Sequence, residues 1–217
     1  MKQFNEFQSK ELLADYGISI PDGAIAKSVD DVHEIVNKIE SDKLVYKILS
    51  DDIVHKSDAG GVKINIPNDK LGTVIIEYHK MIENIKTKFP NAKIDGIYIQ
   101  EMVESGIECI IGIKEDPQFG KVIVFGMGGI YAEVFKDISM RVLPISKEDA
   151  HEMITETKIY KILNGARGKR YDIDAITDTI MKVSQMSDRH DIKELDINPL
   201  VVHEHGVVAL DARIMIA

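Results

Sequence analysis

The sequence lacks the features of disulfide-rich, secreted or membrane-spanning proteins. Its single cysteine, Cys109, excludes an internal disulfide and is compatible with a reducing cytosol. Because Cys109 lies inside the apolar segment 107–113, we expect a buried structural thiol rather than a reactive one. No apolar run is long enough to span a bilayer, and charges throughout residues 1–16 argue against a signal peptide. We therefore expect a cytoplasmic protein with no membrane association.

An excess of positive charge is also missing. The formal net charge of −9 argues against nucleic-acid binding, which needs a basic face. An acidic protein can still bind a nucleotide, because a few local cations and Mg²⁺ are sufficient. The seven histidines form no His-x-x-x-His pair beside a carboxylate, so a zinc site is not expected. Internal repeats and low-complexity segments are absent as well.

The apolar periodicity predicts helices and strands of an α+β protein. Residues 62–66 alternate apolar and polar side chains, as a half-buried strand does. Ser28 and Ser146 are expected to cap helices, the latter with Asp149 in a capping box. Helices are predicted at 5–16, 29–39, 69–88 and 172–187, with a short one after Ser146, and strands at 44–49, 62–66, 94–102, 107–114, 121–125, 131–135, 140–143, 192–198, 200–204 and 207–214.

The order of these elements indicates two α+β lobes after an N-terminal helix. We place the helix in residues 1–19, the smaller lobe in 20–99 and the larger lobe in 100–217. The 217 residues suffice for one large domain or two small lobes. A cleft between two lobes is a common ligand site, and here it would lie near the polar stretch 104–106.

The stretch His-Lys-Ser-Asp-Ala-Gly-Gly-Val at 55–62 connects two apolar, strand-like runs. The glycines Gly60 and Gly61 would let backbone N–H groups approach an anion closely, and lysine supplies a charge for phosphate. The imidazole of His55 is nucleophilic near neutral pH and can carry a covalent group. A glycine hairpin with an exposed histidine is the simpler alternative.

Three further charged residues lie in apolar surroundings. Lys47 is the one charge within Leu-Val-Tyr-Lys-Ile-Leu, where it either faces a phosphate or extends from an edge strand into water. Glu101 and Glu108 stand seven residues apart around a turn. Their carboxylates either accept hydrogen bonds from a ribose or an adenine amino group, or pair with nearby lysines.

Oxygen ligands gather near the C-terminus, in Asp196, Asn198 and Asp211. Hard oxygen donors suit Mg²⁺, which keeps several waters and shares phosphate oxygens. Asp211 is expected within a core-like strand, where an unpaired carboxylate is costly. Arg213, two residues on, either neutralises it or contacts the same triphosphate.

Weaker signals complete the set of candidates. The run Gly126-Met127-Gly128-Gly129 follows a strand but is not a Walker A motif, because no Gly-Lys-Ser/Thr follows, and a tight turn is the simpler interpretation. Arg141 and the segment 167–170 are further cation candidates, the latter more simply a solvated loop.

Taken together, these residues resemble the β subunit of ADP-forming acetyl-CoA (acyl-CoA) synthetases, which are ATP-grasp proteins. The resemblance covers almost the full length, and the 59–62 and 197–200 segments are also similar to succinyl-CoA synthetase β subunits. The motifs that carry it are Tyr-Gly-Ile-x-x-Pro (16–21), Lys47, the 55–62 stretch, Asp-Pro-Gln-Phe-Gly (116–120), Phe-Gly-Met-Gly-Gly-Ile (125–130), Leu-Asp-Ile-Asn-Pro-Leu (195–200) and Leu-Asp-Ala-Arg (210–213).

The resemblance implies an ATP-grasp fold whose two lobes hold ATP or ADP in a cleft. By analogy, Lys47 contacts the phosphates and Glu108 the ribose. Adenine is held by Glu101, Met102 and Val103, and Mg²⁺ by Asn198 and Asp211, with Asp196, Arg213, Arg141, Gly60 and Gly61 as additional candidates. His55 matches the family's phosphorylated histidine on this subunit.

The resemblance also implies a partner. The chain has no CoA-binding module, so a CoA-binding α subunit, in an α₂β₂ assembly, would complete an ADP-forming acetate–CoA ligase. Met1 and the finish after the last strand favour a separately encoded subunit over a piece of a fused enzyme. A stand-alone ATP-grasp carboxylate–amine ligase and a nucleotide-sensing module without turnover remain as alternatives.

Overall fold

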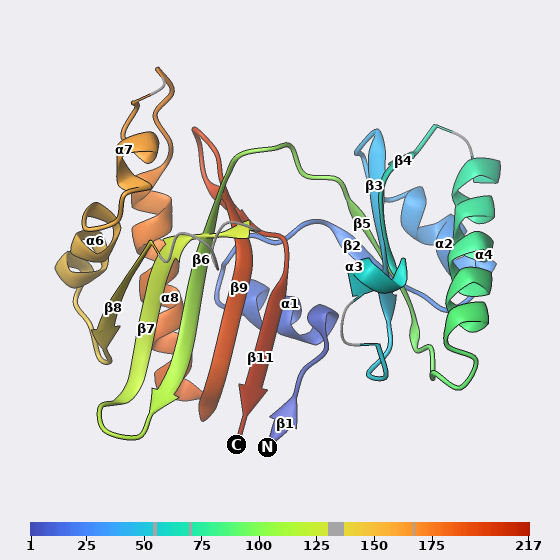
Figure 1. Ribbon diagram of the computed structural model, residues 1–217. Coiled ribbons are helices and arrows are strands. Elements are labelled where there is room, and N and C mark those ends of the chain that lie inside the picture. The colour runs from blue at the N-terminus through green and yellow to red at the C-terminus, as the bar shows by residue number, and fades with distance from the viewer. Residues whose placement is uncertain (54–55, 70, 130–136, 167) are drawn as a thin grey trace. The chain divides into compact units, whose positions relative to one another are not determined.

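The computed structural model describes residues 1–53, 56–69, 71–129, 137–166 and 168–217. Its contacts divide the chain into two compact units, one of residues 1–20 with 105–217 and one of residues 21–104. Both units combine helices and strands (Figure 1), which confirms the α+β prediction. The sequence-based boundaries differ, because the N-terminal segment joins the larger unit: Leu13 packs in its core and Phe4 N–H donates to the Ile214 carbonyl.

The larger unit is a seven-stranded sheet with the path β1-β11-β9-β6-β7-β8, and β10 pairs with β9. Among the described residues, all of its strand pairings are antiparallel. Its strands are β1 (Lys2–Gln3), β6 (Ile107–Asp116), β7 (Gly120–Met127), β8 (Ile138–Val142), β9 (Ile192–Val202), β10 (Val207–Ala209) and β11 (Ala212–Ile216). Its helices are α1 (Glu6–Asp15), α6 (Lys147–Thr155), α7 (Tyr160–Leu163) and α8 (Ile173–Arg189).

Alternation along the strands selects the buried face of this sheet. Cys109, Ile111 and Ile113 of β6 join the apolar core together with residues of α6 and α8. Cys109 is fully buried, and burial raises the pKa of its thiol, so the predicted structural role is confirmed.

The predicted helix cap of the larger unit is present. Ser146 accepts the Asp149 backbone N–H, while the Asp149 carboxylate accepts the Ser146 N–H, which completes the capping box of α6. At α8, Asp172 accepts the Ala175 N–H and also the Gly206 N–H, so one carboxylate joins the helix start to the β9–β10 turn.

The smaller unit is a four-stranded antiparallel sheet with the order β2-β5-β3-β4. Its strands are β2 (Gly23–Ala26), β3 (Lys43–Leu49), β4 (Val62–Pro67) and β5 (Gly96–Glu101), and its helices are α2 (Val29–Val36), α3 (Lys56–Ala59) and α4 (Leu71–Lys88). Ser28 caps α2 through a box with Asp31, as predicted.

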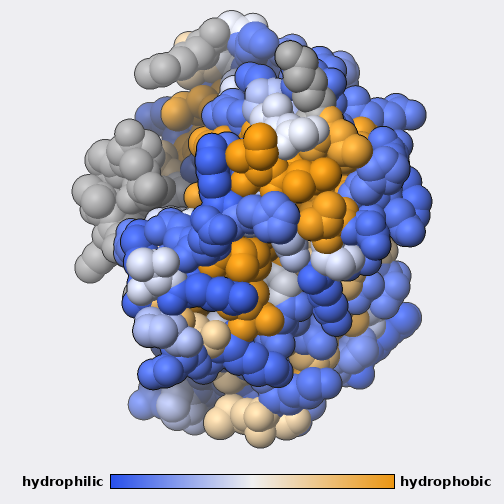
Figure 2. All heavy atoms as spheres, turned by 90° about the vertical axis from the view of Figure 1, so that its right-hand side faces the viewer, coloured by the Kyte–Doolittle hydropathy of each residue, from blue (hydrophilic) through white to orange (hydrophobic). Residues whose placement is uncertain are grey.

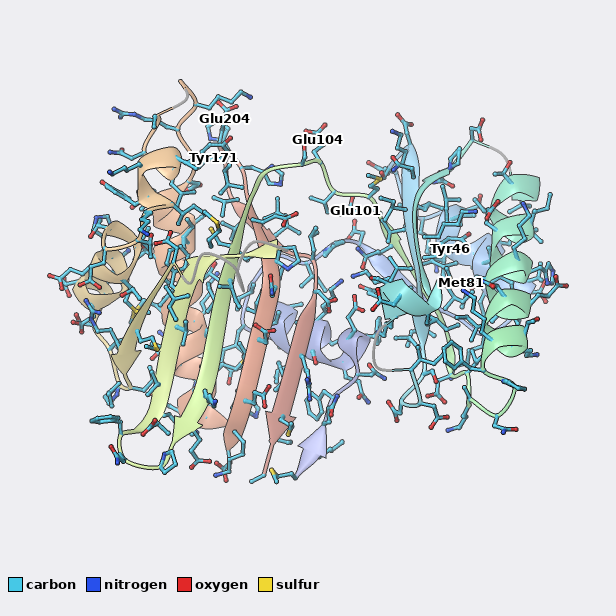
Figure 3. The ribbon with its side chains drawn as sticks, viewed as in Figure 1. Tyr46, Met81, Glu101, Glu104, Tyr171 and Glu204 are labelled. Carbon is cyan, nitrogen blue, oxygen red and sulfur yellow. The ribbon has the colours of Figure 1, made fainter. Side chains whose placement is uncertain are left out.

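One face of this sheet forms a core with α2 and α4. Leu44, Tyr46 and Ile48 of β3 contribute to it together with Ile97 and Ile99 of β5. The Tyr46 hydroxyl donates to the Val74 carbonyl of α4 at 3.1 Å, which satisfies a buried polar group, and Figure 3 shows Tyr46 and Met81 between β3 and α4. Figure 2 shows apolar surface on the side that carries α4, where Leu71 and Ile76 of this helix are exposed.

The regular alternation predicted for residues 62–66 is wrong at its centre. Ile64 is 56% exposed, because Asn65 adopts a left-handed conformation with φ 58°. Leu44 pairs with Ile66 but Tyr46 pairs with Lys63, so β4 places one extra residue opposite Val45. This β-bulge turns the Ile64 side chain toward the face opposite to the expected one.

The buried side of α1 also departs from its apolar pattern. Lys10 and Glu6 are buried and form an ion pair at 3.2 Å, one helical turn apart, beside the fully buried Leu13. A paired charge can be buried where a lone one cannot, so the helix needs fewer apolar residues than the pattern suggests.

The C-terminal strands differ from the predicted hairpin. A single strand, β9, spans both 192–198 and the start of 200–204, and it includes a cis Asn198–Pro199 bond. The predicted strand 207–214 is instead two strands, β10 and β11, which leave Leu210 and Asp211 between them.

The predicted strand 131–135 lies outside the described residues. Within the described ranges, no helix combines the length and apolar character needed to cross a membrane.

Helix α3 ends in a Schellman motif formed by the two glycines of the 55–62 stretch. Gly60 has φ +78°, its N–H donates to the Ser57 carbonyl, and the Gly61 N–H donates to the Lys56 carbonyl. A Cβ on Gly61 would lie 2.4 Å from Ile48 Cγ2, so only glycine lets this turn pack on β3.

We predict that Gly61→Ala destabilises the protein by about 2 kcal/mol, because the methyl group would overpack Ile48. The control is Gly72→Ala in α4, where a Cβ meets nothing within 4 Å and helix propensity favours alanine by about 1 kcal/mol. Urea unfolding measures both variants. Equal midpoints for the two would contradict the packing role of Gly61.

Candidate functional site

Lys47 lies on the face of the smaller sheet opposite α2 and α4, because its neighbours Tyr46 and Ile48 point into the core. It is 8% exposed and sits on β3, which pairs with both β4 and β5. The alternative of an edge-strand lysine is therefore wrong. Tyr98 of β5 is directly opposite Lys47 in the register, and Gln100 shares that face, although the sequence alone did not indicate either residue.

The segment that ends β5 is held by backbone hydrogen bonds on both sides. Glu101 N–H donates to the Asp22 carbonyl at 2.8 Å, and Met102 N–H donates to the Lys43 carbonyl at 2.9 Å. The Glu101 carboxylate accepts the Asp22 N–H at 3.0 Å, so its observed partner is a backbone group rather than a lysine. Glu101 marks the end of β5 in Figure 3, and Val103 follows two residues on.

Residues 56–62 fold as the short helix α3 and the start of β4 rather than as a simple hairpin. His55 lies outside the described residues. Its neighbour Lys56 begins α3, and the Lys88 ammonium of α4 donates to the Ala59 carbonyl at 3.1 Å, which ties the end of α3 to α4. Gly60 and Gly61 thus have a structural reason to be glycine, namely to end α3.

In the larger unit, Asp196 and Asn198 of β9 lie on the sheet face opposite the helical core, because Leu195 and Ile197 point into that core. Gly112 of β6 pairs with Asp196 on one side, and Arg213 of β11 pairs with it on the other. A Cβ on Gly112 would lie 3.3 Å from the Leu195 carbonyl oxygen, so β6 approaches β9 closely at this point. Arg213 of β11 therefore lies opposite Asp196 of β9. Asp211 precedes β11, so Arg213 and Asp211 do not share a strand.

A glycine loop joins three strands at one end of this sheet. Gly128 N–H donates to the Glu108 carbonyl of β6, and Gly129 N–H donates to Asn198 Oδ1 of β9 at 2.9 Å. A Cβ on Gly128 would lie 2.4 Å from the Cys109 carbonyl oxygen, and one on Gly129 would lie 1.8 Å from Glu108 Oε2. The glycines thus bring Glu108, Asn198 and the loop backbone together.

Asp211 joins this group through its backbone, because the Asn198 N–H donates to the Asp211 carbonyl at 3.2 Å. Asp211 is half-buried in the break between β10 and β11, so its expected place within a core-like strand is wrong. A residue outside the strand ladder can turn its carboxylate toward a ligand without giving up a strand pair.

Negative charge concentrates beside Asn198. Burial raises the pKa of the Asp196 carboxyl, the charges of Asp211 and Glu194 raise it further, and Arg213 opposes them. The carboxylates of this group therefore repel one another more than the guanidinium compensates. A cation bound there would be stabilised by the same charges.

Two weaker candidates are held in ion pairs. The Arg141 guanidinium donates to both Glu156 carboxylate oxygens, at 3.0 and 2.6 Å, which favours a role in joining β8 to α6. In the segment 167–170, Lys169 pairs with Glu204 at 2.8 Å on the surface, whereas Arg167 lies outside the described residues.

The donor set of this end of the sheet suits Mg²⁺ rather than zinc. The Asn198 amide oxygen and the Asp211 carboxylate are hard oxygen donors, and an amide oxygen that accepts one N–H retains a second lone pair. In the part of the chain that the structure describes, no three His, Cys, Asp or Glu side chains are arranged to hold a metal by themselves. An ion here would share its coordination with water or a ligand, as Mg²⁺ commonly does.

Comparison with known proteins decides the family. Residues 1–216 match the ATP-grasp domain family. The chain is 43% identical to the β subunit of acetate–CoA ligase (ADP-forming) I of Pyrococcus furiosus, over 97% of this chain and 90% of that subunit. The chain belongs to this ATP-grasp family, and the predicted ATP-grasp fold is confirmed.

A longer ligase and a solved structure are also similar to this chain. Acetate–CoA ligase (ADP-forming) I of Archaeoglobus fulgidus is 44% identical over 94% of this chain, which spans only 30% of that longer ligase. A structure of acetyl-coenzyme A synthetase 1 from Ca. Korarchaeum cryptofilum has a TM-score of 0.84 at 37% identity, covering 100% of this chain and 93% of that one. That structure holds coenzyme A and Mg-AMPPCP, with a phosphohistidine segment pointing towards its nucleotide binding site.

We predict that Gly128→Ala destabilises the protein by about 3 kcal/mol, because its Cβ would collide with the β6 backbone, which cannot move without breaking the sheet. The control is Gly120→Ala, where φ is +77° but nothing lies within 4 Å, so only the backbone conformation costs energy, about 1 kcal/mol. Thermal unfolding compares the two. A Gly128→Ala variant at least as stable as the control would contradict the close loop contact.

Proposed function

We propose that this chain is the nucleotide-binding β subunit of an ADP-forming acyl-CoA synthetase, an acid–thiol ligase. It would transfer a phosphoryl group between a phosphohistidine and ADP. The observation that carries the proposal is the match over 90% of a β subunit from Pyrococcus furiosus, together with the oxygen donors and glycine loop at one end of the larger sheet.

The smaller unit would contribute contacts to both ends of an adenine nucleotide. Lys47, on the face away from the helices, supplies a positive charge for the phosphates. Glu101, Met102 and Val103 would bind adenine, and the backbone hydrogen bonds of Glu101 and Met102 fix the position of that segment. A prepositioned segment loses little entropy when the ligand binds.

The larger unit would hold Mg²⁺ through Asn198 and Asp211, with Asp196 and Arg213 nearby, while Glu108 would bind ribose. When bound, the ion would neutralise phosphate charge during transfer. Burial raises the pKa of Asp196 most, and the charges of Asp211 and Glu194 raise it further. A cation would offset those two charges, which supports this assignment.

His55 would carry the phosphoryl group. In the ADP-phosphorylating direction, the phosphorus–nitrogen bond of phosphohistidine breaks while a bond forms to a β-phosphate oxygen of ADP, which yields ATP and a free imidazole. Alignment and charge neutralisation are the main requirements of such a transfer. Arg141, Gly60 and Gly61 would have supporting structural roles.

A CoA-binding α subunit would supply the acyl phosphate chemistry, and we propose an α₂β₂ assembly in the cytoplasm. The length comparison supports a partner, since the chain spans 30% of the longer ligase of Archaeoglobus fulgidus. Acetate is the acid named for these relatives, and it is our first choice of substrate.

We predict that His55→Ala abolishes acid-labile phosphorylation by Mg-ATP, lowers ligase turnover at least about 1,000-fold, and leaves ADP affinity within about twofold, because the carrier is lost but the nucleotide contacts are not. The assay uses radiolabelled ATP with and without a CoA-binding α subunit. His151→Ala, at an exposed position of α6, is the control and should behave as wild type.

The outcomes of that assay separate the alternatives. Normal turnover by His55→Ala would remove the histidine from the mechanism. A carboxylate–amine ligase would phosphorylate an acid substrate without any partner. A sensing module would bind ADP, but its His55 would not become phosphorylated.

We predict that Asn198→Ala and Asp211→Asn each weaken Mg-ADP binding about tenfold or more, because the first removes an oxygen donor to the ion and the second removes the negative charge of another donor. The affinity for ADP without Mg²⁺ should change little. The control is Asp191→Asn, which neutralises an exposed carboxylate immediately before Ile192, the first residue of β9 and far along the strand from Asn198. Calorimetry with and without Mg²⁺ measures all three, and losses that are independent of Mg²⁺ would contradict the assignment.

A further inference from the structure

A groove of about 350 Å³ runs between β2 and α2 in the smaller unit, on residues that none of the nucleotide assignments uses. Residues 22–25 line one side, and Asp31, Glu34 and Ile35 lie on the helix side, followed by Lys38 and Ile39. Its size falls within the range of ligand pockets. A groove between an edge strand and a helix is the shape that accepts an added strand.

The strand side of the groove is the open edge of the sheet. β2 is the first strand in the order β2-β5-β3-β4, so β5 occupies only one of its two sides. Asp22 and Glu101 form a hydrogen-bonded pair through one backbone bond, from the Glu101 N–H to the Asp22 carbonyl, while the Asp22 N–H donates to the Glu101 carboxylate. Because such pairs alternate in an antiparallel ladder, Gly23 and Ile25 turn their backbone groups away from β5 and toward the open side.

The far end of the same edge is closed by a side chain. The next outward-facing residue, Lys27, donates its N–H to the Asp31 carboxylate of α2 at 2.8 Å. This hydrogen bond is the first cause of the lowered pKa of Asp31, so the carboxylate is ionised at neutral pH. Among the described residues, no such bond from outside the ladder reaches Gly23 or Ile25. The available edge is therefore short and lies along the groove.

The groove has an apolar floor and an acidic rim. Ile35 and Ile39 are buried core residues beneath it, and Ile25 is half-buried. Asp22, Asp31 and Glu34 carry negative charge, against one positive charge at Lys38. An occupant with apolar side chains on one face and lysine or arginine near the rim complements both features.

We propose that this groove binds an extended, basic segment of a partner polypeptide, which adds as a fifth strand beside β2. The backbone groups of Gly23 and Ile25 would pair with the segment, apolar side chains would cover Ile35 and Ile39, and a basic side chain would approach Glu34. The inference stands independently of the proposed enzyme function.

The charges argue for a different polypeptide rather than a second copy of this chain. Two copies that pair through β2 about a two-fold axis would place the same groove residues near their symmetry mates. Asp22, Asp31 and Glu34 would then face like charges, which opposes association. The short edge also predicts a small interface and a weak complex, with a Kd of roughly 10–500 μM.

The test uses the full chain, labelled with ¹⁵N, and a capped hexapeptide of alternating valine and lysine. We expect saturable shifts of the Gly23 and Ile25 amide signals and at least about fivefold slower hydrogen exchange of both amides, because an added strand would protect them. A peptide with glutamate in place of lysine should bind at least about tenfold more weakly, as should one with N-methyl groups on its pairing edge.

A matched pair of variants locates the charge contact. Glu34→Lys should weaken binding about tenfold, whereas Glu40→Lys makes the same charge change outside the groove and should stay within about twofold. No saturable binding at 2 mM peptide, roughly four times the weakest Kd expected, would overturn the proposal. So would shifts confined to other residues, equal affinity for the glutamate peptide, or equal effects of the two variants.

Discussion

The pleat of two antiparallel sheets is the constraint on which the rest of this structure depends. In each sheet, alternate side chains enter a core shared with helices, and the residues between them take the opposite face. Lys47 lies on that opposite face because Tyr46 and Ile48 are needed in the core. The same rule places Asp196 and Asn198 together. The polar chemistry of this chain is thus located by the requirement to bury its apolar neighbours.

Backbone contacts convert these positions into a defined geometry. The glycine loop approaches β6 so closely that a Cβ at Gly128 would meet backbone atoms, and its next residue reaches Asn198 of β9. Glu108, the loop and Asn198 therefore occupy fixed positions relative to one another. In the smaller unit, hydrogen bonds of Glu101 and Met102 to Asp22 and Lys43 have the same effect. Such preorganisation suits phosphoryl transfer, which depends on alignment and charge more than on covalent chemistry.

The sequence predicted features whose cause is local. The caps at Ser28 and Ser146 form as expected, because a side chain and a backbone N–H three residues apart suffice. Burial of Cys109 follows from its apolar neighbours. Features with distant causes were not predicted. The bulge at Asn65 depends on pairing with β3. Apolar periodicity cannot predict the buried Glu6–Lys10 ion pair, because both residues are charged. No local sequence pattern predicted the break between β10 and β11 that leaves Asp211 outside a strand.

By itself, the sequence determined the α+β class, most strand and helix positions, and the family, because spacing and motifs are properties of the chain in order. Tertiary structure alone decided which residues became neighbours. Tyr98 opposite Lys47, Arg213 opposite Asp196, and Gly129 bonded to Asn198 all depend on strand register. Register is set by packing between segments far apart in the sequence, and a shift of one residue would exchange the two faces of a strand.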